Sequence, residues 1–194
     1  MPGFAVIMAQ GRSGSTLLLR MLNAVPGVRI NGENCKAVDH LRAFVESFEG
    51  VTKHHHNDFY KLAWQLPCQV EDVRAKTSAF LKEIYNPGDK LRLAGFKEIR
   101  YGRATYEDLC SDIRFLGAMF GDLKIVFNTR RTDDAVESDF WRTNPDDSRQ
   151  TLELSRENFE RFHAEHPKFT YMMRYEAIRD GSSELQGMFD FLGV

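Results

Sequence analysis

Cysteine and long apolar runs are both scarce in this sequence. The three cysteines, Cys35, Cys68 and Cys110, lie far apart and form no CxxC pair. Their odd number and wide spacing argue against a disulfide framework and favour a reduced, cytoplasmic setting. No apolar run approaches the roughly 20 residues that span a bilayer, and the N-terminal stretch lacks the basic start of a secretory signal. The sequence therefore predicts no membrane span.

An excess of charge of either sign is also missing. The formal net charge is −2, so no global basic field favours nucleic acid or an anionic membrane as a partner. If the protein recognises an anion, the recognition must come from Arg and Lys side chains placed at one site.

What the sequence does contain is a regular alternation of strand and helix patterns. Its 194 residues, 42% of them hydrophobic, suit a single domain over residues 1–194. Buried strands are predicted at residues 4–9, 28–30, 91–96, 123–127 and 169–173. Helices are predicted at 15–24, 39–48, 58–66, 70–85, 106–120, 133–142, 148–165 and 182–192, with a loop at 49–56 and a turn at 86–89. The order predicts a three-layer α/β/α fold with a mainly parallel sheet of about five strands, P-loop NTPase-like, carrying a mostly helical insertion at about 39–85.

The most informative segment follows the first predicted strand and opens the first predicted helix. It reads Gly11-Arg12-Ser13-Gly14-Ser15-Thr16. A Gly-rich turn presents backbone N–H groups, and a helix N-terminus adds partial positive charge, so the segment predicts a site for a phosphate or sulfate ester. The alternative is a plain strand-to-helix connection, in which Gly, Ser and Thr are common for turn and capping reasons.

The segment differs from the phosphate loop of nucleotide triphosphatases. That loop places a Lys directly after its last Gly, whereas Ser15 follows Gly14 here and the cation, Arg12, comes earlier. Kinases and triphosphatases also use an Asp to hold Mg²⁺. The predicted strands end at Asn128 and at Lys97, without that Asp. The loop is therefore predicted to bind an anionic ester without a metal.

A second anion-binding segment is predicted after the fourth strand. Arg130 leaves that strand, and Ser138 lies in the predicted helix that follows. A guanidinium can fork onto a phosphate, and a hydroxyl can add a hydrogen bond to the same anion. The alternative is a surface arginine and a solvated helical serine.

Together the two segments resemble the sulfotransferases that use 3′-phosphoadenosine 5′-phosphosulfate (PAPS). In that family an Arg-bearing loop similar to residues 11–16 binds the 5′-phosphosulfate, and an Arg followed eight positions later by a Ser binds the 3′-phosphate, as in Arg130 and Ser138. The resemblance implies that Tyr175 contacts the adenine, although a core or capping tyrosine fits the sequence equally. Many members continue past the Phe-Leu-Gly segment that ends here near Val194 with a loop that closes over the donor. The chain is thus either a compact member or a truncated one.

Sulfuryl transfer also needs a base for the acceptor hydroxyl and positive charge for the leaving group. Glu33 follows the predicted second strand and is the first choice of base, with an ordinary loop carboxylate as the alternative. Lys97 exits the third strand at the same edge and is predicted to steady the sulfate or orient the acceptor. Glu98 is the reserve base, but strand alternation places it opposite to Lys97. Trp141 could stack on a sugar or pack in the core.

The sequence thus predicts a PAPS-dependent sulfotransferase acting on a hydroxyl-bearing small molecule or glycan. Arg12 and the loop N–H groups would neutralise the departing phosphate, and no metal is needed. Two rivals stay open. One is a P-loop kinase using ATP and Mg²⁺, and the other is a non-catalytic nucleotide-binding domain.

Overall fold

The computed structural model describes residues 3–54, 69–85, 90–138, 141–142 and 144–194. The predicted helix at 58–66 and turn at 86–89 lie outside these residues. Five strands form one sheet in the order β2-β3-β1-β4-β5, and every pair of neighbours is parallel. The strands are β1 (Gly3–Ala9), β2 (Val28–Asn31), β3 (Leu93–Glu98), β4 (Leu123–Thr129) and β5 (Thr170–Arg174). This confirms the predicted three-layer α/β architecture with a parallel five-stranded sheet.

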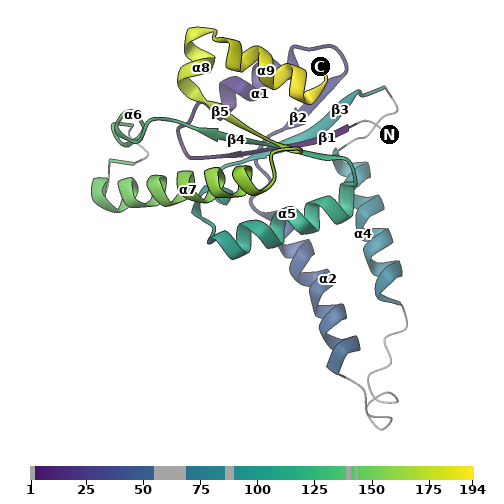
Figure 1. Ribbon diagram of the computed structural model, residues 1–194. Helices are drawn as coiled ribbons and strands as arrows, with labels where there is room; N and C mark the ends of the chain where they lie inside the picture. The colour runs from purple at the N-terminus through teal and green to yellow at the C-terminus, as the bar shows by residue number, and fades with distance from the viewer. Residues whose placement is uncertain (1–2, 55–68, 86–89, 139–140, 143) are drawn as a thin grey trace.

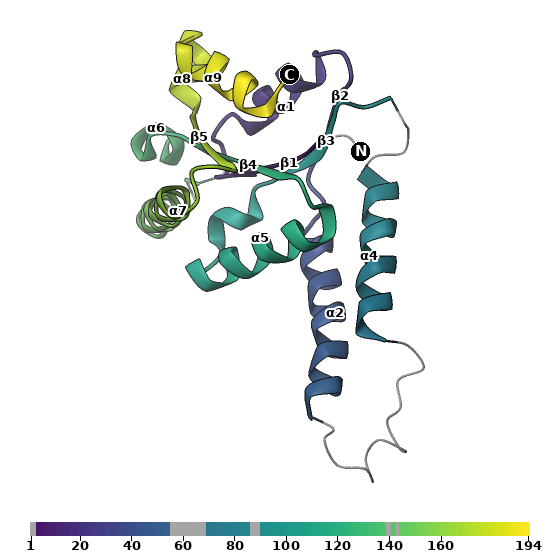
Figure 2. The same ribbon diagram turned by 45° about the vertical axis from the view of Figure 1, so that its right-hand side comes forward.

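Helices cover both faces of the sheet, as Figure 1 shows. One face carries α1 (Ser15–Asn23), α8 (Tyr175–Asp180) and α9 (Ser183–Leu192), and the other carries α5 (Tyr106–Phe120) and α7 (Pro145–Glu165). Two further helices, α2 (Ala37–His54) and α4 (Val70–Tyr85), follow β2 and precede β3 in the chain. They run side by side away from the sheet (Figure 2). None of the described helices is long and apolar enough to cross a membrane.

The core forms because the strands are apolar on both faces, as parallel strands between two helical layers must be. Toward α1, α8 and α9, the residues Ala5, Ile7 and Val126 are fully buried. Toward α5 and α7, the aromatic rings of Phe4 and Phe120 stack at 3.5 Å. The sheet is therefore a rigid platform whose strand ends fix the loops that follow them.

The order of the strands places one loop in a special position. The chain leaves β1 toward β2 on one side and later returns to β4 on the other, so β1 is the switch point of the sheet. Ligands in open α/β sheets bind outside the carboxyl ends of the strands at such a point. The Gly11–Thr16 segment follows β1 directly.

Two local predictions were wrong at the ends of elements, and one short element was not predicted. Residues 49–54, predicted as a loop, continue α2, which lies against α4 and is tied to it by an Arg74 Nε to Glu49 hydrogen bond of 2.9 Å. The predicted helix at 133–142 is only α6 (Thr132–Val136), because the Ser138 hydroxyl donates to the Ala135 carbonyl oxygen and competes with a further helical turn. A short 3-10 helix, η1 (Arg100–Arg103), was not predicted.

Candidate active site

The loop between β1 and α1 leads directly into the N-terminus of α1. The Leu17 and Leu18 N–H groups donate to the Gly14 carbonyl oxygen at 2.9 and 3.1 Å. The N–H groups of Ser15 and Thr16 belong to the first turn of α1, where helical geometry provides no acceptor. Together with the positive end of the helix dipole, they form a binding site for an anionic group.

Two residues of this loop adopt left-handed backbone conformations. Gly14 has φ 74° and Arg12 has φ 66°. Such a conformation is easy for glycine but costs a residue with a Cβ about 1–2 kcal/mol. A non-glycine residue in it is often held there by surrounding structure at a functional site.

Replacing Gly14 by alanine is expected to lower the free energy of unfolding by about 1–3 kcal/mol. The added Cβ would lie 2.2 Å from Cδ2 of Tyr175, in addition to the strain at φ 74°. Urea denaturation measures the effect. The matched control is Gly117→Ala in α5, where a Cβ meets no atom within 4 Å and helix propensity should leave stability equal or higher. Equal stabilities for the two variants would contradict the steric account.

Buried polar side chains hold the loop in place. The Ser13 hydroxyl lies 2.8 Å from both the Gln10 carbonyl oxygen and Oδ1 of Asn128, which lies near the end of β4. Gln10 donates from Nε2 to the Leu152 carbonyl oxygen at 2.7 Å, and its Oε1 accepts from the Arg130 N–H at 3.3 Å. The Ser13 side chain is thus fully buried and supports the loop from beneath.

A cavity of about 390 Å³ opens above this loop. It is lined by Gly11, Arg12, Gly14, Ser15, Thr16, Leu17, Glu33, Lys97, Ile99, Arg130 and Tyr175. Three cations, Arg12, Lys97 and Arg130, therefore surround the N-terminus of α1. We call this space the donor cavity.

Arg130 is held in place by contacts with Arg12 and Tyr175. Its Nη1 donates to the Arg12 carbonyl oxygen at 3.2 Å, and its guanidinium carbon lies 4.6 Å from the centre of the Tyr175 ring. Its Nε–H is buried and has no hydrogen-bond acceptor among the described residues. A buried donor without a partner is costly and fits a site that an anion completes.

Most of the predicted donor-binding residues meet in this cavity, but two are placed differently. Ser13 is buried beneath the loop, as described. The structure does not bring the Ser138 side chain into the cavity lining, and its hydroxyl donates to the Ala135 carbonyl oxygen at 2.7 Å. Since Ser138 lies beyond the end of α6, its eight-residue spacing from Arg130 does not turn its side chain toward the loop.

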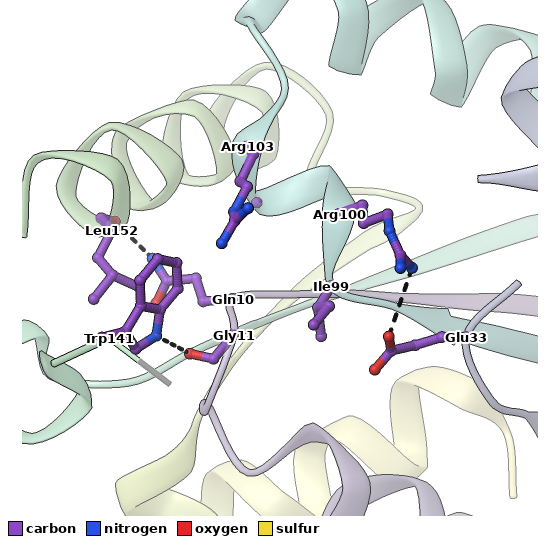
Figure 3. Close-up of a pocket in the computed structure, with 9 residues that line it drawn as sticks. Gln10, Gly11, Glu33, Ile99, Arg100, Arg103, Trp141 and Leu152 are labelled. Atoms are coloured by element: carbon purple, nitrogen blue, oxygen red, sulfur yellow. Dashed lines mark hydrogen bonds and ion pairs between the residues drawn. The ribbon is translucent and has the colours of Figure 1, made fainter. Parts of the chain in front are cut away.

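A second cavity of about 390 Å³ adjoins the donor cavity (Figure 3). It is lined by Gln10, Gly11, Glu33, Ile99, Arg100, Gly102, Arg103, Trp141 and Leu152. Gly11, Glu33 and Ile99 line both spaces. The Glu33 carboxylate therefore lies at the boundary between the donor cavity and the second cavity.

Two cations bind the Glu33 carboxylate. The Lys97 Nζ donates to Oε1 at 2.6 Å, and the Arg100 Nη1 lies 3.7 Å from Oε2. The Lys97 side chain is nearly buried at 6% exposed, whereas that of Glu33 is 32% exposed. Glu33 is thus fixed in direction yet open to the cavities.

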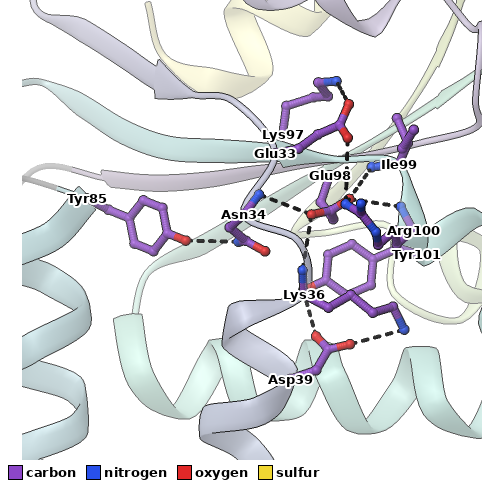
Figure 4. Close-up of polar contacts among 10 residues, drawn as sticks. All are labelled: Glu33, Asn34, Lys36, Asp39, Tyr85, Lys97, Glu98, Ile99, Arg100 and Tyr101. Atoms are coloured by element: carbon purple, nitrogen blue, oxygen red, sulfur yellow. Dashed lines mark hydrogen bonds and ion pairs between the residues drawn. The ribbon is translucent and has the colours of Figure 1, made fainter.

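Glu98, the residue after Lys97 on β3, is buried, and both of its carboxylate oxygens accept hydrogen bonds (Figure 4). Its Oε1 accepts from the backbone N–H groups of Ile99 and Arg100 at 3.0 and 3.1 Å and from the Arg100 Nη1 at 3.1 Å. Its Oε2 accepts from the backbone N–H groups of Asn34 and Lys36 at 3.1 and 3.4 Å. A buried carboxylate with this many donors organises two loops, which favours Glu33 over Glu98 as the base.

The loop that carries Glu33 is strained at the point where Glu98 holds it. Cys35 and Lys36 have φ 55° and 62°, both left-handed and both without the freedom of glycine. The Lys36 ammonium then binds Oδ2 of Asp39 at 3.1 Å, at the start of α2. Hydrogen bonds to the buried Glu98 carboxylate thus fix the position from which Glu33 reaches the cavities.

Beneath this loop lies a buried acid with an altered pKa. Asp112 on α5 binds Arg42 Nε through Oδ1 at 2.8 Å. Burial and then the nearby Asp39 carboxylate raise the pKa of Asp112 from 3.8 to about 6, against the opposing effect of Arg42 and Lys36. The folded protein therefore binds a proton at Asp112 over a pH range in which the unfolded chain does not.

This shift predicts a pH-dependent loss of stability. Because the folded pKa is raised, the contribution of Asp112 is most favourable below about pH 4 and declines by about 3 kcal/mol as pH rises through about 6. Asp112→Asn should remove that slope, as measured by urea denaturation across this range. The control is Asp72→Asn at an exposed position of α4. A wild-type slope that persists in Asp112→Asn would contradict the assignment.

Three residues of the site were missed by reasoning from the sequence. Gln10 and Asn128 act through buried hydrogen bonds, and their only signal was their place directly after a strand. Arg103 lies on η1, which is too short for a periodic pattern. Trp141, considered for either a groove or the core, does both, since it is buried, lines the second cavity and donates from Nε1 to the Gly11 carbonyl oxygen at 3.0 Å.

A parallel sheet with a Gly-rich loop and a helix N-terminus at its switch point is typical of α/β proteins that bind phosphate or sulfate esters. The model of the sulfotransferase family matches residues 5–194. The chain belongs to the sulfotransferase family.

Two solved structures share this fold. The sulfotransferase domain of the olefin synthase from Synechococcus PCC 7002 is 22% identical with a TM-score of 0.64, and the match covers 100% of this chain and 74% of that one. The sulfotransferase from Alicyclobacillus acidocaldarius is 14% identical with a TM-score of 0.59, covering 100% and 81%. No curated protein matches the chain.

Proposed function

We propose that the protein transfers the sulfuryl group of PAPS to a hydroxyl acceptor, with Glu33 as the general base. The observation that carries the proposal is the position of Glu33 on the wall shared by the donor cavity and the second cavity. A base there can reach an acceptor hydroxyl that points at a donor held by the β1–α1 loop.

The donor cavity offers the groups that such a donor needs. The N–H groups of Ser15 and Thr16, together with Arg12, face the place of the 5′-phosphosulfate. Arg130, with its buried and unfilled Nε–H, would bind the 3′-phosphate, and Tyr175 beside it offers a ring face to the adenine. The resemblance to PAPS-dependent sulfotransferases suggests these roles, and the charges and positions of the side chains support them.

The chemistry is one in-line displacement at sulfur. The acceptor oxygen forms its bond to sulfur as the bond from sulfur to the 5′-phosphate oxygen breaks, and those electrons leave with adenosine 3′,5′-bisphosphate (PAP). The acceptor proton passes to the Glu33 carboxylate. Arg12 and the loop N–H groups offset the negative charge that grows on the leaving phosphate. Lys97 lines the donor cavity beside Glu33, where its ammonium can steady the sulfuryl oxygens.

Calorimetric titration with PAP, and separately with ATP and Mg²⁺, tests the proposal. Micromolar binding of PAP with much weaker binding of ATP is expected, because the loop has no Lys after Gly14 and neither β3 nor β4 ends in an Asp. A preference for ATP with Mg²⁺ would favour the kinase instead, and binding of neither would favour a non-catalytic domain.

A further inference from the structure

A larger cavity lies at the opposite edge of the sheet from the donor cavity. Its volume is about 680 Å³, and its lining comes mainly from α5 and the C-terminal end of α7. Leu123, the first residue of β4, and Phe169, just before β5, also line it, so it lies at the amino ends of these parallel strands. No described residue lines both this cavity and the donor cavity or the second cavity. We call it the amino-end cavity.

The wall of the amino-end cavity is rich in apolar groups and rings. Ile113, Leu123 and Phe162 are buried side chains of the hydrophobic core that reach this wall. The ring centres of Phe162 and His166 lie 4.5 Å apart, and those of His166 and Phe169 lie 5.5 Å apart. Phe162 and Phe169 meet edge to face at 80°. A cluster of rings in such mixed orientations can pack against a further aromatic ring.

Gly117 keeps part of this wall open. It lies in α5, where glycine lowers helix stability relative to alanine. Its backbone does not need glycine, unlike that of Gly121, which ends the helix with φ 80°. No described neighbour needs it either, because a Cβ at Gly117 would meet no atom within 4 Å. The missing side chain therefore leaves space in the cavity at the expense of the helix, as a site for a ligand would.

The charged side chains of the amino-end cavity offset one another. Glu165 accepts hydrogen bonds from Arg161 Nε at 3.2 Å and from the Tyr106 hydroxyl, so its charge is already matched. Arg114 and Asp122, both exposed, bring one positive and one negative charge to the lining. An ion in the cavity would be attracted by one of them and repelled by the other. The lining therefore favours an uncharged ligand, which loses least on leaving water.

From these features we infer that the amino-end cavity binds an uncharged aromatic molecule of fused rings. Ligand cavities of proteins commonly have volumes of about 300–1,000 Å³ and mostly apolar walls. The rings of Phe162, His166 and Phe169 would contact the ligand ring, and Gly117 would leave room for it. The inference goes beyond the proposed function and does not depend on it, since the two sites lie at opposite edges of the sheet.

Three probes that share one ring system test the inference by calorimetry at about pH 8, where an ordinary imidazole is neutral. They are indole, the anion indole-3-acetate and the cation tryptamine. Indole carries no hydroxyl, so it is not an acceptor for the proposed reaction. Indole is expected to bind with a Kd of about 0.1 mM, and each charged probe about tenfold more weakly. Equal or tighter binding of a charged probe would overturn the inference.

Gly117→Leu should weaken indole binding by about tenfold or more, because the new side chain occupies the space of the ligand. The variant should remain folded by urea denaturation, since leucine favours helix more than glycine does. The matched control is Ala118→Leu, at the next and exposed position of α5, which does not line the cavity. It should bind indole as the wild type does. Wild-type affinity in a folded Gly117→Leu would contradict the assignment.

The two thiols of the described chain locate the bound probe. Cys110 lines the amino-end cavity, whereas Cys35 is exposed in the loop that carries Glu33. Indole should slow the alkylation of Cys110 by iodoacetamide and leave that of Cys35 unchanged, as measured by mass spectrometry of the peptides. Protection of Cys35 alone would place indole at the active site and overturn the inference. So would a wild-type dimer that Gly117→Leu dissociates, because a second copy would then cover the cavity.

Discussion

Replacing Glu33 by glutamine is expected to lower sulfuryl transfer by about 10²–10⁴-fold while PAP affinity stays within a few fold. Glutamine keeps the shape of the side chain and can still accept a hydrogen bond from Lys97, which lies 2.6 Å from Oε1. It cannot take the proton of the acceptor hydroxyl. Transfer from labelled PAPS and calorimetry with PAP, both on the purified variant, measure the two quantities.

Two controls make this result specific. Glu83→Gln, at an exposed position of α4, should leave transfer unchanged. Glu98→Gln should lower the free energy of unfolding instead, because an amide group would then face the donors that now meet a buried carboxylate. Full transfer activity in Glu33→Gln would show that Glu33 is not the base. A Glu98→Gln variant that unfolds would indicate a structural role for Glu98.

Replacing Arg130 by alanine is expected to weaken PAP binding by about 30-fold or more. The side chain brings a cation with a buried, unfilled Nε–H to the donor cavity, and it stacks on Tyr175. Its removal deletes the charge opposite the 3′-phosphate. It also deletes the 3.2 Å bond from Nη1 to the Arg12 carbonyl oxygen, which loosens the loop itself.

The next residue provides the matched control. Arg131 is 64% exposed in its side chain, binds Asp134 and Glu176, and does not line the donor cavity. Arg131→Ala should therefore keep the PAP affinity of the wild type. Arg130→Lys separates charge from geometry, since it keeps the cation and loses the planar fork. Unchanged PAP affinity in Arg130→Ala, with the fold intact by circular dichroism, would place the 3′-phosphate elsewhere.

The part of the site that the sequence could predict follows from short-range physics. A buried strand, a Gly-rich turn and an amphipathic helix are adjacent in the chain, so the anion-binding loop at residues 11–16 can be recognised without knowing the rest of the fold. The parallel sheet then brings Glu33, Lys97 and Arg130 to the same edge, because all three follow or end strands. Alternation along β3 likewise separates Lys97 from Glu98, as observed.

The rest depends on contacts between distant parts of the chain. Ser138 has the expected spacing from Arg130, yet the direction of its side chain depends on where α6 ends, and that is decided by a hydroxyl bonding back to Ala135. The buried role of Glu98 depends on N–H groups 62 and 64 positions away in sequence. The second cavity joins η1, Trp141 and α7, which no periodic pattern links.

Three residues with left-handed backbones, Arg12, Cys35 and Lys36, sit in the two loops that frame the donor cavity and Glu33. Each conformation costs about 1–2 kcal/mol, out of a net folding stability that is commonly about 5–15 kcal/mol. Glycine at these positions would relieve that cost and also release the loops to sample other shapes. Selection for heat resistance and selection for turnover would therefore favour different residues at these three positions. Engineering for robustness should begin in the sheet and its covering helices.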